Sequence, residues 1–181
     1  MDDIDNPEEL IKQAKAGDET ALTRLYNDFY APVYRYLYFR ARDRAEAEDL
    51  AQETFLRFFQ TLQKYQYRGT TPLAFLFRIA RNILIDTGRR KKNWVQFSEL
   101  FGKNEEPREN PTEQRENAEM VRMALKELPE AEQEAVTLCY INDLSYSEIA
   151  QLIGKNEEAV RQAVSRALKR LREYFMKNNL L

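Results

Sequence analysis

Histidine is absent from the 181-residue chain, and cysteine occurs once, as Cys139. The chain therefore lacks the commonest general base and metal ligand, and no cluster of cysteines and carboxylates replaces it. A single cysteine cannot form an internal disulfide, and the apolar run AVTLCYI around Cys139 predicts a buried side chain rather than a reactive thiol. There is also no glycine-rich phosphate loop. We therefore expect no metal, no cofactor and no enzymatic activity.

Glycine is scarce, with five residues, and no apolar run approaches the length of a membrane span. The acidic N-terminus MDDIDNPEE is unlike a signal peptide. A soluble, cytoplasmic protein without membrane insertion is therefore expected. Few glycines and prolines, together with apolar residues that recur at helical spacing nearly throughout, predict an all-α fold.

The helical pattern fails between residues 93 and 117. This stretch includes KNEEPRENPTEQREN, which is acidic, contains two prolines and lacks a sustained apolar face. It predicts a flexible acidic linker between a helical domain at residues 1–92 and a smaller one at residues 118–181. The net charge of the whole chain is only -2, but Arg161 to Arg172 contains five cations and no acid. Positive charge concentrated in this way is typical of a nucleic-acid-binding helix.

In the first domain, the helix that begins at Pro72 carries the most distinctive pattern. Thr71 is suited to cap it, and proline is favoured at the first helical position. One face of this helix is apolar and predicts a core contact: Leu73, Leu76, Phe77, Ala80, Ile83 and Leu84. The opposite face carries Arg78, Arg81 and Asn82, and the preceding loop carries Tyr65, Tyr67 and Arg68. Aromatic rings beside arginines suit unpaired nucleic acid, because rings stack on bases while cations hold phosphates. An amphipathic helix with solubilising charges would show the same pattern.

Four helices are expected before this one, and the first of them is capped by Asn6 and ends at Gly17. Pro32 is expected to begin a new helix after one that starts at Asp18. A longer helix follows Asp43 and runs to about Gln63. Its buried candidates are Leu50, Thr54, Leu56, Phe58 and Leu62. Its exposed side shows an acidic strip that includes Asp49, Gln52 and Glu53, which by itself indicates only a solvated surface.

The second domain is predicted to contain a helix-turn-helix. Ser145 and Glu148 form a capping box, Gly154 ends that helix, and Asn156 caps the last one. On the last helix the polar face carries side chains that read base edges or hold phosphates: Arg161, Gln162, Ser165, Arg166 and Lys169. A solvated helical hairpin is the alternative interpretation.

The whole arrangement resembles a bacterial extracytoplasmic-function (ECF) sigma factor, a two-domain sigma factor with regions 2 and 4. AEDLAQETFLRFF is similar to the family's polymerase-binding helix, and YRG…FLFRIARN is similar to its −10-reading and promoter-melting segment. LPEAEQEAVTLCYINDLSYSEIAQLIGKNEEAVRQAVSRALKRLR is similar to its −35-reading domain. Three such segments in this order cover nearly the whole chain.

The resemblance implies a role for each matched residue. Asp49, Gln52 and Glu53 would bind the clamp helices of the RNA polymerase core. Single-stranded −10 DNA would be bound by Tyr65, Tyr67, Arg68, Arg78, Arg81 and Asn82. The −35 duplex would be read by Arg161, Gln162, Ser165 and Arg166, and Lys169 would hold phosphate. The resemblance leaves open whether an anti-sigma protein holds the chain inactive.

Some residues depart from the family pattern. Phe75 stands where tryptophan is usual, Glu157 and Glu158 replace a smaller start of the last helix, and Ala163 stands where arginine is common. These departures concern the promoter sequences that are read. Two other functions stay possible on the sequence: a dimeric helix-turn-helix repressor, which would bind duplex DNA without polymerase, and a helical adaptor that binds only protein.

Overall fold

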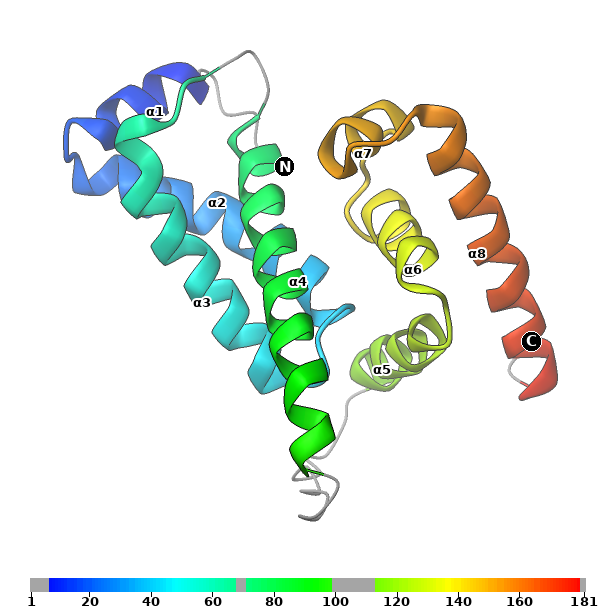
Figure 1. The fold of residues 1–181 in the computed structure, drawn as a ribbon. Helices are drawn as coiled ribbons and strands as arrows, with labels where there is room; N and C mark the ends of the chain where they lie inside the picture. The colour runs from blue at the N-terminus through cyan, green and yellow to red at the C-terminus, as the bar shows by residue number, and fades with distance from the viewer. Residues whose placement is uncertain (1–6, 68–70, 99–112, 180–181) are drawn as a thin grey trace.

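A computed structural model describes residues 7–67, 71–98 and 113–179, and the side chains of all of these except 89–98 and 113–115. The described residues form helices and no strand, which confirms the all-α prediction (Figure 1). The N-terminal domain contains α1 (Pro7–Lys15), α2 (Glu19–Tyr38), α3 (Arg44–Thr61), the 3₁₀ turn η1 (Leu62–Lys64) and α4 (Pro72–Ser98). The C-terminal domain contains α5 (Glu113–Lys126), α6 (Glu130–Val136), the π-helical turn η2 (Thr137–Ile141), α7 (Tyr146–Ile153) and α8 (Glu157–Lys177).

The helix-turn-helix begins and ends where its capping residues predict. Ser145 and Glu148 form a complete capping box at the start of α7. Gly154 ends α7 in the left-handed conformation, with φ of 70°, which glycine adopts without steric cost. Asn156 then accepts a hydrogen bond of 2.7 Å from the backbone N–H of Ala159 and so caps α8. Local signals therefore fix where α7 ends and where α8 begins.

Helix α2 contradicts one prediction, because it runs through Pro32 without interruption. Proline removes a backbone hydrogen bond from a helix interior, at a cost of about 3 kcal/mol. Beyond Pro32, the helix buries Val33, Tyr36 and Leu37 completely. Burial of each such side chain contributes about 1.5–3 kcal/mol, so packing offsets the lost hydrogen bond.

Helix α3 corrects the prediction for Leu56, which is 58 % exposed rather than buried. Each helical residue turns the chain by about 100°, so a side chain two positions from both Thr54 and Phe58 points away from them. Thr54 and Phe58 are fully buried. Phe55 takes the inward place that was assigned to Leu56 and is 2 % exposed.

The two domains pack against each other through a shared apolar cluster. Helix α4 contacts α7, and α2 contacts η2. Buried residues of α2, α3 and α4, such as Val33, Phe58 and Leu76, belong to the same cluster as Leu138 and Ile149 of the C-terminal domain. The predicted linker is described only at its ends, where α4 extends to Ser98 and α5 begins at Glu113; the rest lies outside the described residues.

Candidate nucleic-acid interface

Helix α8 presents the predicted reading residues on one exposed face. Arg161, Gln162, Ser165, Arg166 and Lys169 are all exposed. The opposite face is buried against α6 and α7 through Val160, Ala163, Val164 and Ala167. The structure therefore brings these five side chains together and turns them outward, as a helix that enters a major groove requires.

Acidic residues hold several of these cations in place. The Glu158 carboxylate accepts hydrogen bonds from Arg161 at 3.3 Å and from Gln162 at 3.0 Å. The Glu132 carboxylate, on α6, lies 3.0 Å from the Nε of Arg166 and 3.0 Å from the Nε of Arg170. Glu132 is buried, so it fixes the direction in which both guanidinium groups leave the helix.

Glu132 and Arg170 are not among the residues that the sequence predicts for this site. Arg170 follows Arg166 by one helical turn and lies in the cationic run, a spacing that could have indicated it. Glu132 gave no signal, because its contact with α8 depends on how α6 packs. Tyr146 was missed for the same reason: the guanidinium carbon of Arg161 lies 5.9 Å from the centre of its ring, a cation–π contact.

Helix α4 presents its predicted residues less uniformly. Thr71 accepts a hydrogen bond of 3.1 Å from the N–H of Leu73, as expected of a cap. Arg78 and Asn82 are exposed. Arg81 differs, because its side chain is only 27 % exposed and its Nε donates to Glu134 of α6 at 2.9 Å. The structure thus places Arg81 between the domains rather than on an open face with Arg78 and Asn82.

The loop before α4 holds one tyrosine by packing. The ring of Tyr65 lies 4.9 Å from the ring of Phe75, centre to centre, and both pack against the core. Burial raises the pKa of the Tyr65 hydroxyl. Its carbonyl accepts a hydrogen bond from Lys15 on α1. Tyr67 is half-buried, and Arg68 lies outside the described residues.

The predicted acidic strip lies on the outer side of α3. Asp49 and Gln52 are exposed, while Glu53 is partly exposed and forms an ion pair with Arg57. Leu56 follows Gln52 by four residues and Glu53 by three, so it lies on the same face. The strip therefore includes an exposed apolar side chain, although the sequence predicts Leu56 in the core.

Comparison with known proteins identifies the family to which this arrangement belongs. Residues 25–94 match Sigma-70 region 2, and residues 118–171 match Sigma-70, region 4. ECF RNA polymerase sigma factor SigM of Bacillus subtilis is 32% identical over 156 residues, which are 85% of this chain and 94% of SigM. The chain belongs to the ECF RNA polymerase sigma factors.

Two further similarities extend the comparison. ECF RNA polymerase sigma factor BldN of Streptomyces coelicolor is 37% identical over 168 residues, which are 90% of this sigma factor but only 63% of BldN. The solved structure of CnrH in complex with the cytosolic domain of CnrY has a TM-score of 0.74 at 21% identity, and the match covers 94% of this chain and 97% of that one. That likeness shows a common fold.

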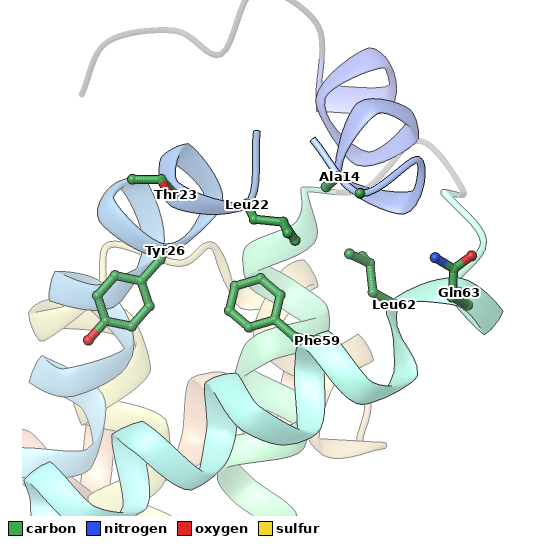
Figure 2. A pocket seen from close by; sticks show the side chains of 8 residues that line it. Ala14, Leu22, Thr23, Tyr26, Phe59, Leu62 and Gln63 are labelled. Carbon is green, nitrogen blue, oxygen red and sulfur yellow. The ribbon is translucent and has the colours of Figure 1, made fainter. Parts of the chain in front are cut away.

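The sigma factor also has an apolar pocket at the junction of α1, α2, α3 and η1 (Figure 2). Its volume is about 590 Å³, and Leu22, Tyr26, Phe59 and Leu62 line much of it. Thr23 and Gln63 are polar residues in the lining, which contains no acid, cation, histidine or cysteine.

Neither a metal centre nor a membrane span is found where the structure can be described. In those residues, no three side chains among histidine, cysteine, aspartate and glutamate are grouped so that they could hold a metal ion. No described helix combines the length and apolar character needed to cross a bilayer.

Proposed function

We propose that this sigma factor binds the RNA polymerase core, recognises −10 and −35 promoter elements, and assists promoter melting in the bacterial cytoplasm. It makes and breaks no covalent bond itself. The observation that carries the proposal is the outward face of α8, where five reading residues stand on a correctly capped helix-turn-helix. The division into residues 1–92, 93–117 and 118–181 is part of the proposal.

At the −35 element, α8 would lie in the major groove of duplex DNA. Arg161 and Gln162 carry donors that can bind a base edge in pairs, and each such pair discriminates bases by about 1–3 kcal/mol. Ser165 and Arg166 extend the same face. Lys169 lies two turns beyond Gln162 and would hold backbone phosphate.

At the −10 element, the partner would be single-stranded DNA beside α4. Tyr67, Arg68, Arg78 and Asn82 would bind flipped bases and the backbone, with Tyr65 and Arg81 as neighbours on the loop and helix. Stacking on an aromatic ring contributes about 1–3 kcal/mol per base, which offsets part of the cost of opening the duplex. One loop cannot supply the whole cost, so the polymerase must contribute.

Binding to the polymerase core would use the exposed strip of α3. Asp49, Gln52 and Glu53 offer acidic and amide groups to a basic partner surface, and Leu56 adds an apolar contact. The solved structure of CnrH contains a second protein, the cytosolic domain of CnrY. The sigma factor RpoE of Bartonella quintana, 22% identical to this chain, has been solved in complex with the anti-sigma factor NepR. We propose that an anti-sigma protein binds this chain as well.

Transcription in vitro with purified core polymerase on a promoter library tests the proposal. The sigma factor should direct initiation at a consistent pair of elements, whereas core polymerase alone should not. A gel-shift assay on the selected promoters provides the second measurement. A dimeric repressor would bind this duplex DNA tightly without polymerase, and a protein-only adaptor would show no salt-dependent DNA affinity in either assay. Either result would contradict the proposed function.

A further inference from the structure

Glu134 of α6 lies at the centre of the contact between the two domains. Its Oε1 accepts hydrogen bonds from the hydroxyl of Tyr36 at 3.1 Å and from Nε of Arg81 at 2.9 Å. Arg40 brings a second guanidinium to 3.3 Å from the same oxygen. Glu134 and Tyr36 are buried, and the Arg40 side chain is 5 % exposed. One carboxylate of the C-terminal domain thus joins three residues of the N-terminal domain.

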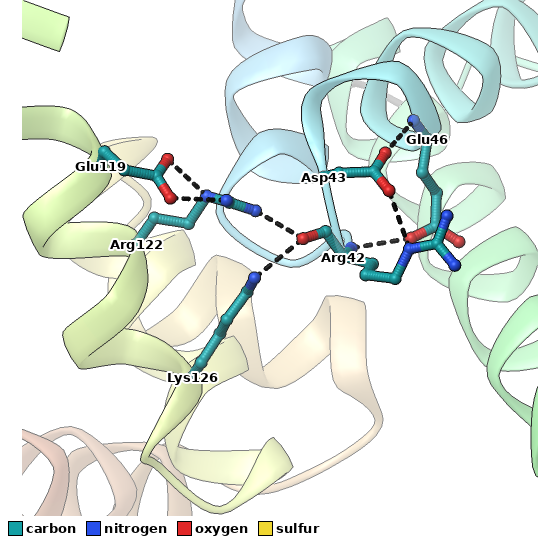
Figure 3. Close-up of polar contacts among 6 residues, drawn as sticks. All are labelled: Arg42, Asp43, Glu46, Glu119, Arg122 and Lys126. Atoms are coloured by element: carbon teal, nitrogen blue, oxygen red, sulfur yellow. Dashed lines mark hydrogen bonds and ion pairs between the residues drawn. The ribbon is translucent and has the colours of Figure 1, made fainter. Parts of the chain in front are cut away.

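Helix α5 makes a second polar contact with the N-terminal domain (Figure 3). Arg122 and Lys126 donate to the backbone carbonyl of Arg42, in the turn between α2 and α3, at 2.6 and 2.8 Å. Glu119 holds the Arg122 guanidinium through hydrogen bonds of 2.6 and 2.8 Å. It also accepts a hydrogen bond of 3.2 Å from Tyr38. Two separate sites therefore fix the domains in one closed arrangement.

The closed arrangement occupies part of the proposed −10 surface. The Arg81 guanidinium is bound to Glu134 and is largely enclosed, so it is not available to DNA. Helix α7 packs against α4 nearby. By contrast, Asp49 and Gln52 on α3 stay exposed. The polymerase-binding strip is accessible while one of the −10-reading cations is not.

Promoter geometry also conflicts with the closed arrangement. Elements at −10 and −35 are about 25 base pairs apart, which corresponds to about 85 Å at about 3.4 Å per base pair. A compact chain of this length has a radius of gyration of about 16 Å. The two reading helices cannot reach both elements unless the domains separate.

We propose that the Glu134 contact is an autoinhibitory latch, which keeps the free sigma factor from binding single-stranded promoter DNA until the polymerase core has bound. The inference rests on the proposed function of α4 and α8. Separation rehydrates Glu134, Arg40 and Arg81, and a buried ion cluster gains little net stability over its hydrated partners. The latch is therefore specific in geometry and adds little net stability to the apolar contact between the domains, which polymerase binding must also overcome.

The variant Glu134→Gln tests the latch. It removes the buried carboxylate beside Arg40 and leaves that enclosed arginine with only the exposed carboxylate of Glu130, which favours the open form. The matched control is Glu130→Gln, on the same helix, because Glu130 lies 3.6 Å from the same arginine but its side chain is 77 % exposed. Small-angle X-ray scattering reports the radius of gyration. Fluorescence anisotropy with a single-stranded DNA pool of random sequence, without polymerase, reports DNA binding.

For Glu134→Gln we expect a larger radius of gyration and about tenfold tighter binding to the DNA pool, the gain expected if the open form is about one tenth of the wild-type population. Glu130→Gln should match the wild type in both measurements. Gln133→Ala provides a second variant that strands no charge, because it removes only a hydrogen bond of 3.1 Å to the carbonyl of Phe39. It should shift both measurements in the same direction, by less.

Wild-type scattering and DNA affinity in both Glu134→Gln and Gln133→Ala would overturn the latch. Equal gains in Glu130→Gln would also overturn it, because the effect would then come from charge alone. Transcription by the wild type with core polymerase is measured alongside. Normal transcription combined with unchanged variants refutes the latch while the proposed function stands, whereas absent transcription refutes the proposed function whatever the scattering shows.

Discussion

The two proposed DNA-reading helices, α4 and α8, differ in what surrounds them. Helix α8 buries one face against α6 and α7 and leaves its reading face open. Helix α4 packs against α2 and α3 on one side and against α7 on another, so less of its surface stays free. Arg81 shows the consequence: a cation that a helical wheel places opposite the apolar face is bound to Glu134 of the other domain.

Polar periodicity therefore predicts the direction in which a side chain leaves its helix, but not which residue of another helix it contacts. Arg161 and Arg81 are both arginines opposite an apolar stripe. The Arg161 side chain is 60% exposed, and the Arg81 side chain is 27% exposed. The difference comes from the packing of α6 and α7 against α4, which no local pattern records.

The largest expected effect concerns the inner faces of the two helices. Phe77 of α4 is 1 % exposed and packs edge-on against Tyr36, whereas Leu168 of α8 is 40 % exposed. Phe77→Ala should lower the free energy of unfolding by about 3–5 kcal/mol. Leu168→Ala should lower it by much less. Urea denaturation followed by circular dichroism measures both, and equal losses would contradict the picture of α4 as the more enclosed helix.

Charge reversal on α3 should separate polymerase binding from DNA reading by either helix. The double variant Asp49→Lys and Glu53→Lys should weaken core binding by about 2–4 kcal/mol, if these residues form the centre of that interface. Its helical content and its affinity for isolated −35 duplex DNA should stay unchanged. Titration against labelled core polymerase provides the measurement. If the double variant binds core polymerase with wild-type affinity, the strip is an ordinary solvated surface and not the polymerase interface.

The next prediction compares two tyrosines of the loop that precedes α4. Tyr67→Ala should lower open-complex yield on duplex promoters by an amount equivalent to about 1–3 kcal/mol, because a flipped base loses its stacking partner. A template already unpaired across the −10 region should restore part of the activity. Tyr65→Ala should instead lower the melting temperature, because its ring packs on Phe75.

Melting temperature is measured beside transcription from the duplex and unpaired templates. If Tyr67→Ala has a lower melting temperature and loses the same fraction of transcription on both templates, Tyr67 stabilises the fold and does not capture a base. The loop before α4 would then contribute less to DNA binding than the exposed face of α8.

On α8, variants that lose a base contact should differ in their DNA binding from variants that lose a phosphate contact. Arg161→Ala or Gln162→Ala should change the preferred −35 sequence, at a cost of about 1–3 kcal/mol. Lys169→Ala should weaken binding to all sequences and reduce its salt dependence. Selection from a randomised −35 library at two salt concentrations separates the two cases. Uniform losses in all three variants would exclude direct base readout by this helix.

The smallest effect is expected for Glu158→Gln. Glu158 accepts hydrogen bonds from Arg161 and Gln162, and its negative charge lies beside the proposed phosphate contacts. Removing this exposed charge should tighten −35 duplex binding by less than about 1 kcal/mol. Glu173→Gln, farther along the same helix, is a matched control for net charge. Equal gains in both variants would show that the effect is not local to the reading residues.

Much of the fold could be predicted because its signals are local. The capping box at Ser145, the left-handed Gly154 and the cap at Asn156 each involve residues within one helical turn, and all three were found as expected. Pro32 and Leu56 were predicted wrongly. For Pro32, the buried face of α2 outweighed a local helix-breaking signal. For Leu56, an apolar residue was assigned to the core although its phase placed it outside.

The candidate site shows the same division. Sequence selected Arg161, Gln162 and Ser165, and the structure places them together on one exposed face. The sequence does not predict Glu132, which binds Arg166 from a different helix. The sequence assigned Tyr65 and Tyr67 the same role, but the structure packs Tyr65 on Phe75.

The all-helical class, the capped helix-turn-helix and the family follow from the chain alone, because helical periodicity, caps and family motifs are all local features. The contact of Glu134 with Tyr36 and Arg81 across the two domains depends on tertiary packing. The hydrogen bond between Arg81 and Glu134 joins residues 53 positions apart, and the one between Tyr36 and Glu134 joins residues 98 positions apart. Pairings over such separations depend on how whole helices pack, since the energy that selects them comes from burial of complete faces rather than from any neighbouring residue.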